Sequence, residues 1–206
     1  MIWSGMLHSL PTAEKLFYCV YYSLLELLGD EKADEIFSSA GLDPFDINAP
    51  KYFRHGSELL IMIASELRNY FGEETTRGLL IRMGSASLTF FRKYFTNIAQ
   101  LGNIENRLKP LDRRFLSSLN TLAESLSEEL GLPINCSAKD ARNFEWQYPK
   151  PSSDLPAPAL IPFFYFGLLE EFCTWLDTRK NYLLNYAVDD NQRAMDIISI
   201  EIRDLD

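Results

Sequence analysis

Apolar residues recur every three or four positions through the first two thirds of the chain, a spacing that is typical of amphipathic helices. The pattern predicts helices over residues 13–28, 31–40, 58–71, 73–100 and 112–130. Four of these segments are followed by a glycine that fits a helix C-terminal cap: Gly29, Gly41, Gly72 and Gly131. The prolines and closing glycine of residues 42–56 predict a loop between the second and third helices.

The first predicted helix is apolar on more than one face. Leu16, Val20 and Leu24 lie on one side of it, and Phe17 and Tyr21 lie on another. A helix that is apolar nearly all round is buried. Because one domain of this size offers limited surface to cover it, we expect the protein to form a homodimer.

The spacing of apolar residues changes in the last third of the chain. Phe144, Trp146 and Tyr148 alternate with polar residues, which predicts a strand over Asn143–Pro149. Two further apolar segments flank the polar residues DDNQR, and this arrangement predicts a C-terminal β-hairpin with strands 181–188 and 194–202.

This order of elements predicts an α+β fold, in which N-terminal helices pack on a small antiparallel sheet that includes the C-terminal β-hairpin. The length suits a single domain over residues 1–206, with residues 1–11 as an N-terminal extension.

The segment IPFFYFGLLEEFCTW, Ile161–Trp175, is predicted to be a helix whose apolar arc is wider than the roughly 100° stripe of a surface helix. It must therefore be covered on two sides, by the sheet and by the helical layer or a cavity. Opposite it we expect the small residues of Gly84–Ser87, because glycine permits close approach of a backbone or a ligand. Either a ligand or solid core then occupies the space lined by these candidate residues: Gly84, Phe91, Phe95, Phe164, Phe166, Gly167, Leu168 and Trp175.

The chain is acidic, with a formal net charge of -9 at pH 7. Proteins that bind nucleic acid or anionic membranes non-specifically carry a basic patch. The nearest candidate, KPLDRR at Lys109–Arg114, is interpreted as a solvated helix face. No apolar run reaches the roughly 18 residues of a membrane span, so we expect neither a nucleic-acid partner nor a membrane span.

Cysteine and histidine are sparse and scattered: Cys19, Cys136, Cys173, His8 and His55. An odd, widely spaced cysteine set is typical of a reducing compartment, and the N-terminus does not resemble a signal peptide, so we expect a cytoplasmic protein without an intramolecular disulfide. No zinc-ligand spacing, phosphate-binding loop or nucleophile motif occurs. We therefore expect no catalytic residue, no metal and no cofactor.

Three segments carry a resemblance to a known family: LLELLGDEKADEIFSSAGLD, ELRNYFGEETTRGLLIRMGSAS and FFYFGLLEEF. Their order and spacing resemble the 4-vinyl reductase-like family of hydrocarbon-binding proteins, over roughly Leu16 to Ile202. The resemblance implies a fold shared with haem-dependent nitric-oxide sensor domains and TRAPP vesicle-tethering subunits, in which helices pack on an antiparallel sheet and can enclose an apolar ligand.

Two features of that group are missing from this sequence. Family members often carry cysteines in the closing strands, whereas residues 181–202 contain none. The haem sensors use a proximal histidine and a Tyr-x-Ser-x-Arg motif, and neither is visible here. The resemblance therefore implies neither a metal site nor haem in this protein.

Three hypotheses about function follow. The first is a sensory or regulatory module that binds an apolar or tetrapyrrole-like small molecule and has no catalysis of its own. The second is a protein-interaction or scaffold dimer with a solid aromatic core. The third is an enzyme or accessory protein related to tetrapyrrole vinyl reductases.

Overall fold

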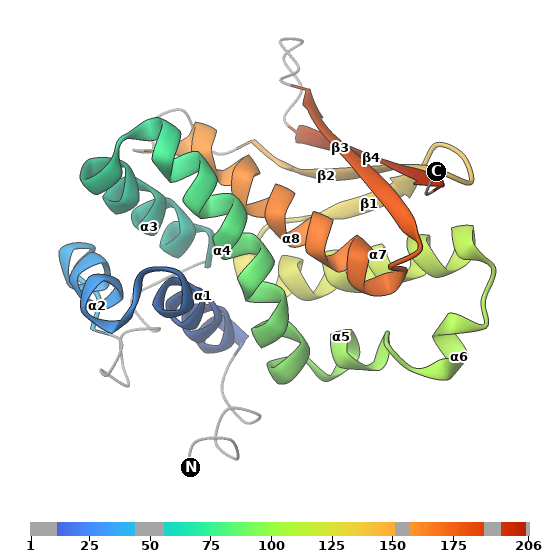
Figure 1. Cartoon of the computed structure of the whole chain (residues 1–206), viewed down its shortest axis with the longest axis horizontal. Helices are drawn as coiled ribbons and strands as arrows, with labels where there is room; N and C mark the ends of the chain where they lie inside the picture. The colour runs from blue at the N-terminus through green and yellow to red at the C-terminus, as the bar shows by residue number, and fades with distance from the viewer. Residues whose placement is uncertain (1–11, 44–55, 151–156, 188–194, 205–206) are drawn as a thin grey trace.

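The computed structural model describes residues 12–43, 56–150, 157–187 and 195–204 (Figure 1). Residues 1–11, predicted as an N-terminal extension, and most of the predicted loop 42–56 lie outside the described residues. The helices are α1 (Thr12–Leu28), α2 (Asp30–Ser39), α3 (Gly56–Phe71), α4 (Glu73–Tyr94), α5 (Thr96–Gln100), α6 (Ile104–Arg107), α7 (Leu111–Leu130) and α8 (Ile161–Leu176), preceded by a 3-10 turn over Pro158–Leu160. The strands are β1 (Asn135–Ala138), β2 (Asn143–Pro149), β3 (Lys180–Ala187) and β4 (Met195–Asp204).

The glycines that separate the N-terminal helices do so by their backbone conformation. Gly29 between α1 and α2 has φ 80°, and Gly72 between α3 and α4 has φ 76°. This left-handed region is open to glycine and disfavoured for other residues. One helix therefore ends and the next begins at each of these glycines, and the helix ends lie where the sequence predicts them.

One predicted helix is wrong in its extent. Residues 73–100 form two helices, because Phe95 adopts an extended conformation with φ -109° and ψ 105°. Phe95 and Ile98 are both buried, so this break turns the chain and directs both side chains into the core. The periodicity continues across the break, which is why the sequence pattern does not reveal it.

The α+β fold and the C-terminal antiparallel strands are confirmed. The sheet is antiparallel throughout, with strand order β1-β2-β4-β3. Strand β2 has the predicted bounds, and β3 and β4 pair with each other as the predicted hairpin requires. The polar residues proposed as its turn lie outside the described residues. Strand β1 was not predicted; it is short and pairs Cys136 with Trp146.

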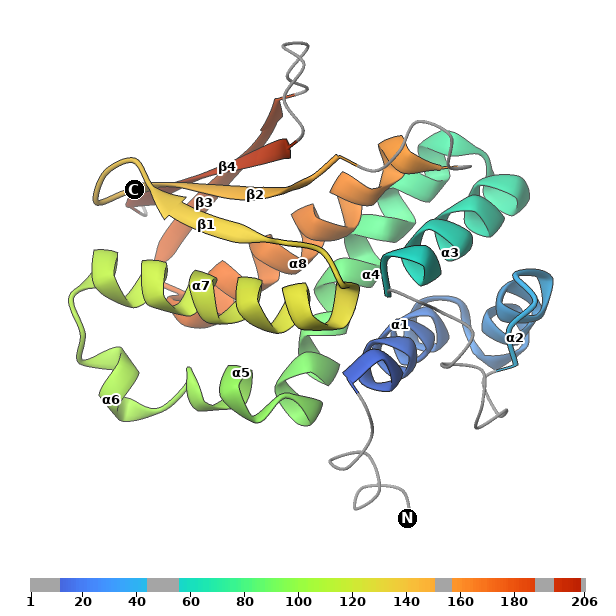
Figure 2. The same cartoon turned by 180° about the vertical axis from the view of Figure 1, so that it is seen from behind.

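One face of the sheet is covered by α7 and α8, as Figure 2 shows. The ring of Tyr165 on α8 lies 6.2 Å from Trp146 and 4.6 Å from Tyr148, both on β2. On α7, Phe115 contacts Phe144 of β2 and Tyr182 of β3. The side chains that point to the opposite face are only partly buried along β2 and β4. The helices therefore lie on one face, and α8 separates the sheet from α4.

Helix α1 is covered within the single chain. Phe17 packs edge-on against Phe37 of α2, with ring centroids 5.4 Å apart. The hydroxyl groups of Ser23 on α1 and Ser87 on α4 lie 2.9 Å apart. The reason that the sequence gives for a homodimer, an uncovered apolar helix, therefore does not apply, and the dimer itself stays a prediction. In the described part of the chain, no helix is both long and apolar enough to cross a membrane.

Candidate functional site

The predicted apolar site falls on the contact between α4 and α8. A Cβ atom placed on Gly84 would lie 2.1 Å from the carbonyl oxygen of Phe164, and one on Gly167 would lie 1.7 Å from the carbonyl oxygen of Ile81. Each glycine thus receives the backbone of the other helix. We call Ile81, Gly84, Phe164 and Gly167 the glycine contact. It leaves no room for a ligand at its centre.

The other predicted residues lie around this contact. Phe164 and Leu168 are fully buried, whereas Phe166 and Trp175 are partly buried against the core. Phe91 and Phe95 lie at the C-terminal end of α4, with ring centroids 5.3 Å apart. The structure therefore brings Gly84, Phe164, Gly167 and Leu168 into one contact and places the remaining aromatic residues beyond it.

A link between the two helices exists at that aromatic end as well. The guanidinium of Arg92 on α4 lies 4.5 Å from the centre of the Trp175 ring on α8. A Cβ atom on Gly102, after α5, would also approach the Trp175 ring, at 3.1 Å. Trp175 therefore packs against α4 and the chain that follows α5.

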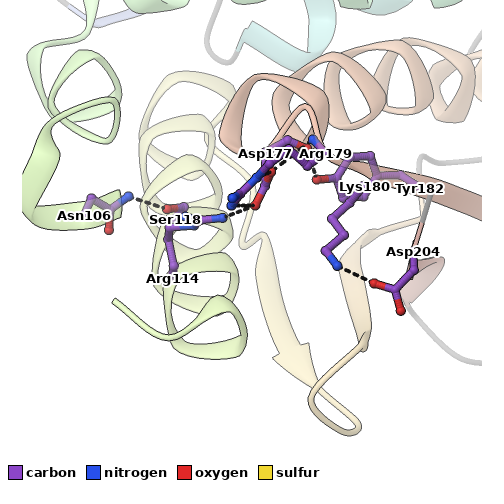
Figure 3. Close-up of polar contacts among 8 residues, drawn as sticks. All are labelled: Asn106, Arg114, Ser118, Asp177, Arg179, Lys180, Tyr182 and Asp204. Carbon is purple, nitrogen blue, oxygen red and sulfur yellow. Dashed lines mark hydrogen bonds and ion pairs between the residues drawn. The ribbon is translucent and has the colours of Figure 1, made fainter. Parts of the chain in front are cut away.

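A second site, which the sequence does not reveal, lies where α8 ends (Figure 3). The Arg114 guanidinium on α7 donates a hydrogen bond to Asp177 Oδ2 at 2.7 Å, and their side chains are 7% and 2% exposed. Arg179 donates from Nε to Oδ1 at 3.0 Å and from Nη2 to Oδ2 at 2.9 Å. Both carboxylate oxygens of Asp177 therefore have guanidinium partners.

Further hydrogen bonds fix the backbone around Asp177. The Tyr182 hydroxyl donates to the Asp177 carbonyl at 2.6 Å, and Lys180 pairs with Asp204 across the edge of the sheet. On α7, the next turn is held by a 3.1 Å hydrogen bond from Asn106 to Ser118 (Figure 3). Helices α7 and α8 and strand β3 are thus joined at one point.

An open pocket of about 410 Å³ lies against this cluster. It is lined by Lys109, Leu111, Arg114, Asp177, Arg179 and Lys180. We call these six residues the Asp177 corner. It contains four cationic side chains and a single carboxylate, in a protein whose net charge is -9.

The charges set the protonation state of the corner. Hydrogen bonds from Arg179, and then from Arg114, hold the pKa of the Asp177 carboxyl well below its ordinary value, although burial acts in the opposite direction. Asp177 is therefore ionised under all ordinary conditions. The interpretation of Lys109–Arg114 as a solvated face is wrong for Arg114, which is 6% exposed because Asp177 compensates its charge.

A further carboxyl group is buried without an ion pair among the described residues. Glu129, near the C-terminal end of α7, is 2% exposed. Its Oε2 accepts a long, 3.4 Å hydrogen bond from the Leu16 backbone amide, and its Oε1 has no hydrogen-bond partner in the described part of the chain. Burial raises the pKa of this carboxyl to about 8. It is therefore largely protonated at neutral pH.

Comparisons with known proteins bear on the fold alone. No family model matches the sequence, and no curated protein matches it either. Among solved structures, it is similar to an oxygen-binding H-NOX domain related to soluble guanylate cyclases, with a TM-score of 0.62 and 12% identity over 92% of this chain and 93% of the other. It is equally similar to a mutant H-NOX from T. tengcongensis, with a TM-score of 0.62 and 12% identity over 93% and 96%.

A third solved structure concerns haem redox potential and porphyrin distortion, with a TM-score of 0.63 and 12% identity over 93% of this chain and 94% of the other. The likeness spans nearly the whole of each protein. It shows that the present fold is the H-NOX fold, in agreement with the fold kinship that the sequence resemblance implies.

The described residues do not fit haem. Haem iron is most often held by histidine or by a cysteine thiolate, and His8 and His55 both lie outside the described residues. Burial raises the pKa of the thiols of Cys19, Cys136 and Cys173, to about 12 for Cys136, so these groups are protonated in the metal-free protein. The described residues also contain no group of three or more His, Cys, Asp or Glu side chains that could hold a metal ion.

Proposed function

We propose that this protein is a small-molecule-binding module, sensory or regulatory in role, which shares the H-NOX fold but works without haem and without catalysis of its own. The observation that carries this proposal is the combination of an H-NOX fold along nearly the full sequence with described residues that include no histidine and three separate, buried cysteines. The similar structures are described as binding haem or oxygen, so ligand binding is the function that this fold most directly suggests. Kinship with the 4-vinyl reductase-like family is part of the same proposal.

The proposed ligand is apolar and lies at the aromatic end of the α4–α8 pair. At the glycine contact the backbones touch, so Gly84, Phe164, Gly167 and Leu168 hold the helices together. Phe91, Phe95 and Trp175 lie beyond that contact, with Phe166 partly buried along α8. Large aromatic surfaces of this kind recognise apolar molecules by van der Waals contact.

Two measurements test this proposal. The uncharged fluorophore N-phenyl-1-naphthylamine is expected to bind saturably, and added haemin is expected to produce no stoichiometric complex with a shifted Soret band. Phe95→Leu is expected to change the fluorophore affinity, whereas Phe37→Leu, a matched core change between α1 and α2, is expected to leave it unchanged. A stoichiometric haem complex would contradict the haem-free assignment, and a lack of fluorophore uptake would contradict the apolar ligand.

The second candidate is a protein-interaction scaffold with a solid core. The backbone contact at Gly84 and Gly167 favours it, because a module that only needs rigidity benefits from closely packed helices. It predicts no fluorophore uptake and a dimer mass in light scattering at micromolar concentration. A monomer that takes up the fluorophore would exclude this candidate.

A further inference from the structure

We propose that the Asp177 corner is a binding site for a small phosphate-type oxyanion, either free phosphate or the phosphate group of a small phosphomonoester. This site is separate from the proposed apolar site and does not depend on it. The charge of the pocket, the donors that remain available and the start of α7 all favour such a ligand.

The first observation is an excess of positive charge. Lys109, Arg114, Arg179 and Lys180 line the pocket together with one carboxylate, Asp177, and Lys180 has a further carboxylate partner, Asp204, outside the lining. Both oxygens of Asp177 already accept hydrogen bonds from the two arginines. In an acidic protein, such a local cluster attracts an anion to one point of the surface and not to the surface as a whole.

The second observation is that donors remain free for a ligand. Arg179 binds Asp177 through Nε and Nη2, which leaves Nη1 on the other side of a guanidinium whose side chain is 80% exposed. Lys109 forms no ion pair with any residue that the structure describes, and it lines the pocket. Arg114 is held in place by Asp177, so the cationic wall is already ordered before a ligand arrives.

The third observation is the N-terminus of α7, a helix of 20 residues. Its first backbone hydrogen bond runs from the Arg114 amide to the Pro110 carbonyl, and no side chain caps the helix. The amides of the three preceding residues therefore have no acceptor within the helix, and Leu111 lines the pocket. Helix N-termini of this kind favour anions through open amides and the helix dipole.

The size and number of donors favour phosphate over other anions. A pocket of about 410 Å³ lies within the range of small-molecule sites. A carboxylate can be satisfied by one guanidinium fork, whereas a phosphate dianion offers three acceptor oxygens to donors from separate segments. The donors here come from the segment before α7, from α7 itself and from the junction of α8 with β3.

The test is a calorimetric titration of the full-length protein with inorganic phosphate at constant ionic strength, repeated with succinate. Saturable phosphate binding is expected, and Lys109→Ala and Arg179→Ala are each expected to weaken it about tenfold, as the loss of a charge-assisted hydrogen bond implies. Arg77→Ala is the matched control, because Arg77 is also a surface arginine paired with carboxylates, but on α4.

Each outcome has a fixed meaning. Weakening by the two corner variants but not by Arg77→Ala supports the site, provided that circular dichroism shows the variants folded. Absence of saturable phosphate binding overturns the proposal. Equal weakening by all three variants also overturns it, because it would reflect net charge alone. Succinate binding without phosphate binding would overturn the assignment of ligand class.

Discussion

Helix α8 meets the rest of the protein in two very different ways. In its middle, the glycine contact brings two backbones together with no side chain between them. At its end, the Asp177 corner joins α8 to α7 through a carboxylate shared by two arginines. The first contact is steric, with a 3.1 Å hydrogen bond from the Ser85 hydroxyl to the Gly167 carbonyl beside it, whereas the second is electrostatic and open to solvent at Arg179.

This difference shows which residues of the fold can be substituted without loss of stability. The glycine contact admits no additional atom, but it contains no titratable group and is insensitive to pH and salt. The Asp177 corner depends on charge, but its exposed members can be replaced without disturbing the core. Helix α8 therefore combines a rigid contact in its middle with a charged pocket at its end whose exposed members can vary.

The largest effect is expected at the glycine contact. Gly167→Ala would place a Cβ atom 1.7 Å from the Ile81 carbonyl oxygen, and backbone on both helices leaves no flexible side chain to move aside. We expect the free energy of unfolding to fall by about 3 kcal/mol or more, as for severe overpacking. Urea unfolding followed by circular dichroism measures this change.

Gly78→Ala is the control for that variant. Gly78 lies on α4, the partner helix in this contact, but apart from its own helix backbone and chain neighbours no atom of the described residues lies within 4 Å of its Cβ position. Replacing a helical glycine by alanine there is expected to raise stability by up to about 1 kcal/mol. Similar stabilities for the two variants would show that the glycine contact is not as tight as the structure indicates.

The next largest effect is expected at the base of the Asp177 corner. Asp177→Ala leaves the buried guanidinium of Arg114 without its carboxylate, which is expected to cost about 2 kcal/mol or more at neutral pH. Because the arginines lower the pKa of Asp177 in the folded state, its stabilising contribution is present above the ordinary carboxyl pKa, about 4, and is lost as the pH falls further. The difference in the free energy of unfolding between the parent and the variant should therefore become smaller towards about pH 2. A difference that does not change with pH would show that the ion pair is not its source.

Glu129 provides the opposite case, a buried carboxyl without an ion pair among the described residues, whose pKa the charge of Lys15 lowers by less than burial raises it. Its pKa is raised from 4.5 to about 8 in the folded state, so the native protein retains a proton that is released on unfolding. Stability contributed by this group is therefore full below about pH 4.5 and is lost as the pH rises towards 8. Glu129→Gln is expected to gain about 1–2 kcal/mol at pH 9 and little at pH 5.

Thermal unfolding at these two pH values measures the effect. Glu124→Gln, at an exposed residue of the same helix whose charge does not act on the Glu129 pKa, is the matched control and should show no gain that depends on pH. An equal response of the two variants would mean that net charge, and not the burial of Glu129, determines the pH dependence.

The helices and strands could largely be predicted from the sequence, because the spacing of apolar residues within a short segment distinguishes a helix from a strand. Strand β2 and the helix ends at Gly29 and Gly72 follow directly from alternation and from glycine. The break at Phe95 and the short strand β1 could not be predicted in this way. Phe95 keeps the helical spacing while its backbone turns, and β1 is defined only by pairing with β2.

The candidate sites were predictable only where they depend on shape. The small residues in α4 and α8 indicated the glycine contact, because a glycine inside a predicted helix suggests by itself that another backbone approaches closely there. Arg114 and Asp177 lie far apart in the sequence, and each alone resembles a solvated charge. Only the fold brings them to 2.7 Å, so no local pattern could reveal the Asp177 corner.

The smallest stability effect is expected at Arg179, and it sharpens the comparison between the two regions. Arg179→Ala removes two hydrogen bonds to Asp177, but Arg114 continues to partner that carboxylate and the Arg179 side chain is largely exposed. Exposed ion pairs contribute little to stability because water and salt screen them. We expect no resolvable change in urea unfolding and a clear loss of phosphate affinity in the same variant. A loss of stability as large as that of Asp177→Ala would instead mean that Arg179 contributes to the fold as much as the buried Arg114–Asp177 pair does. The Asp177 corner would then have no residue that can be changed without weakening the fold.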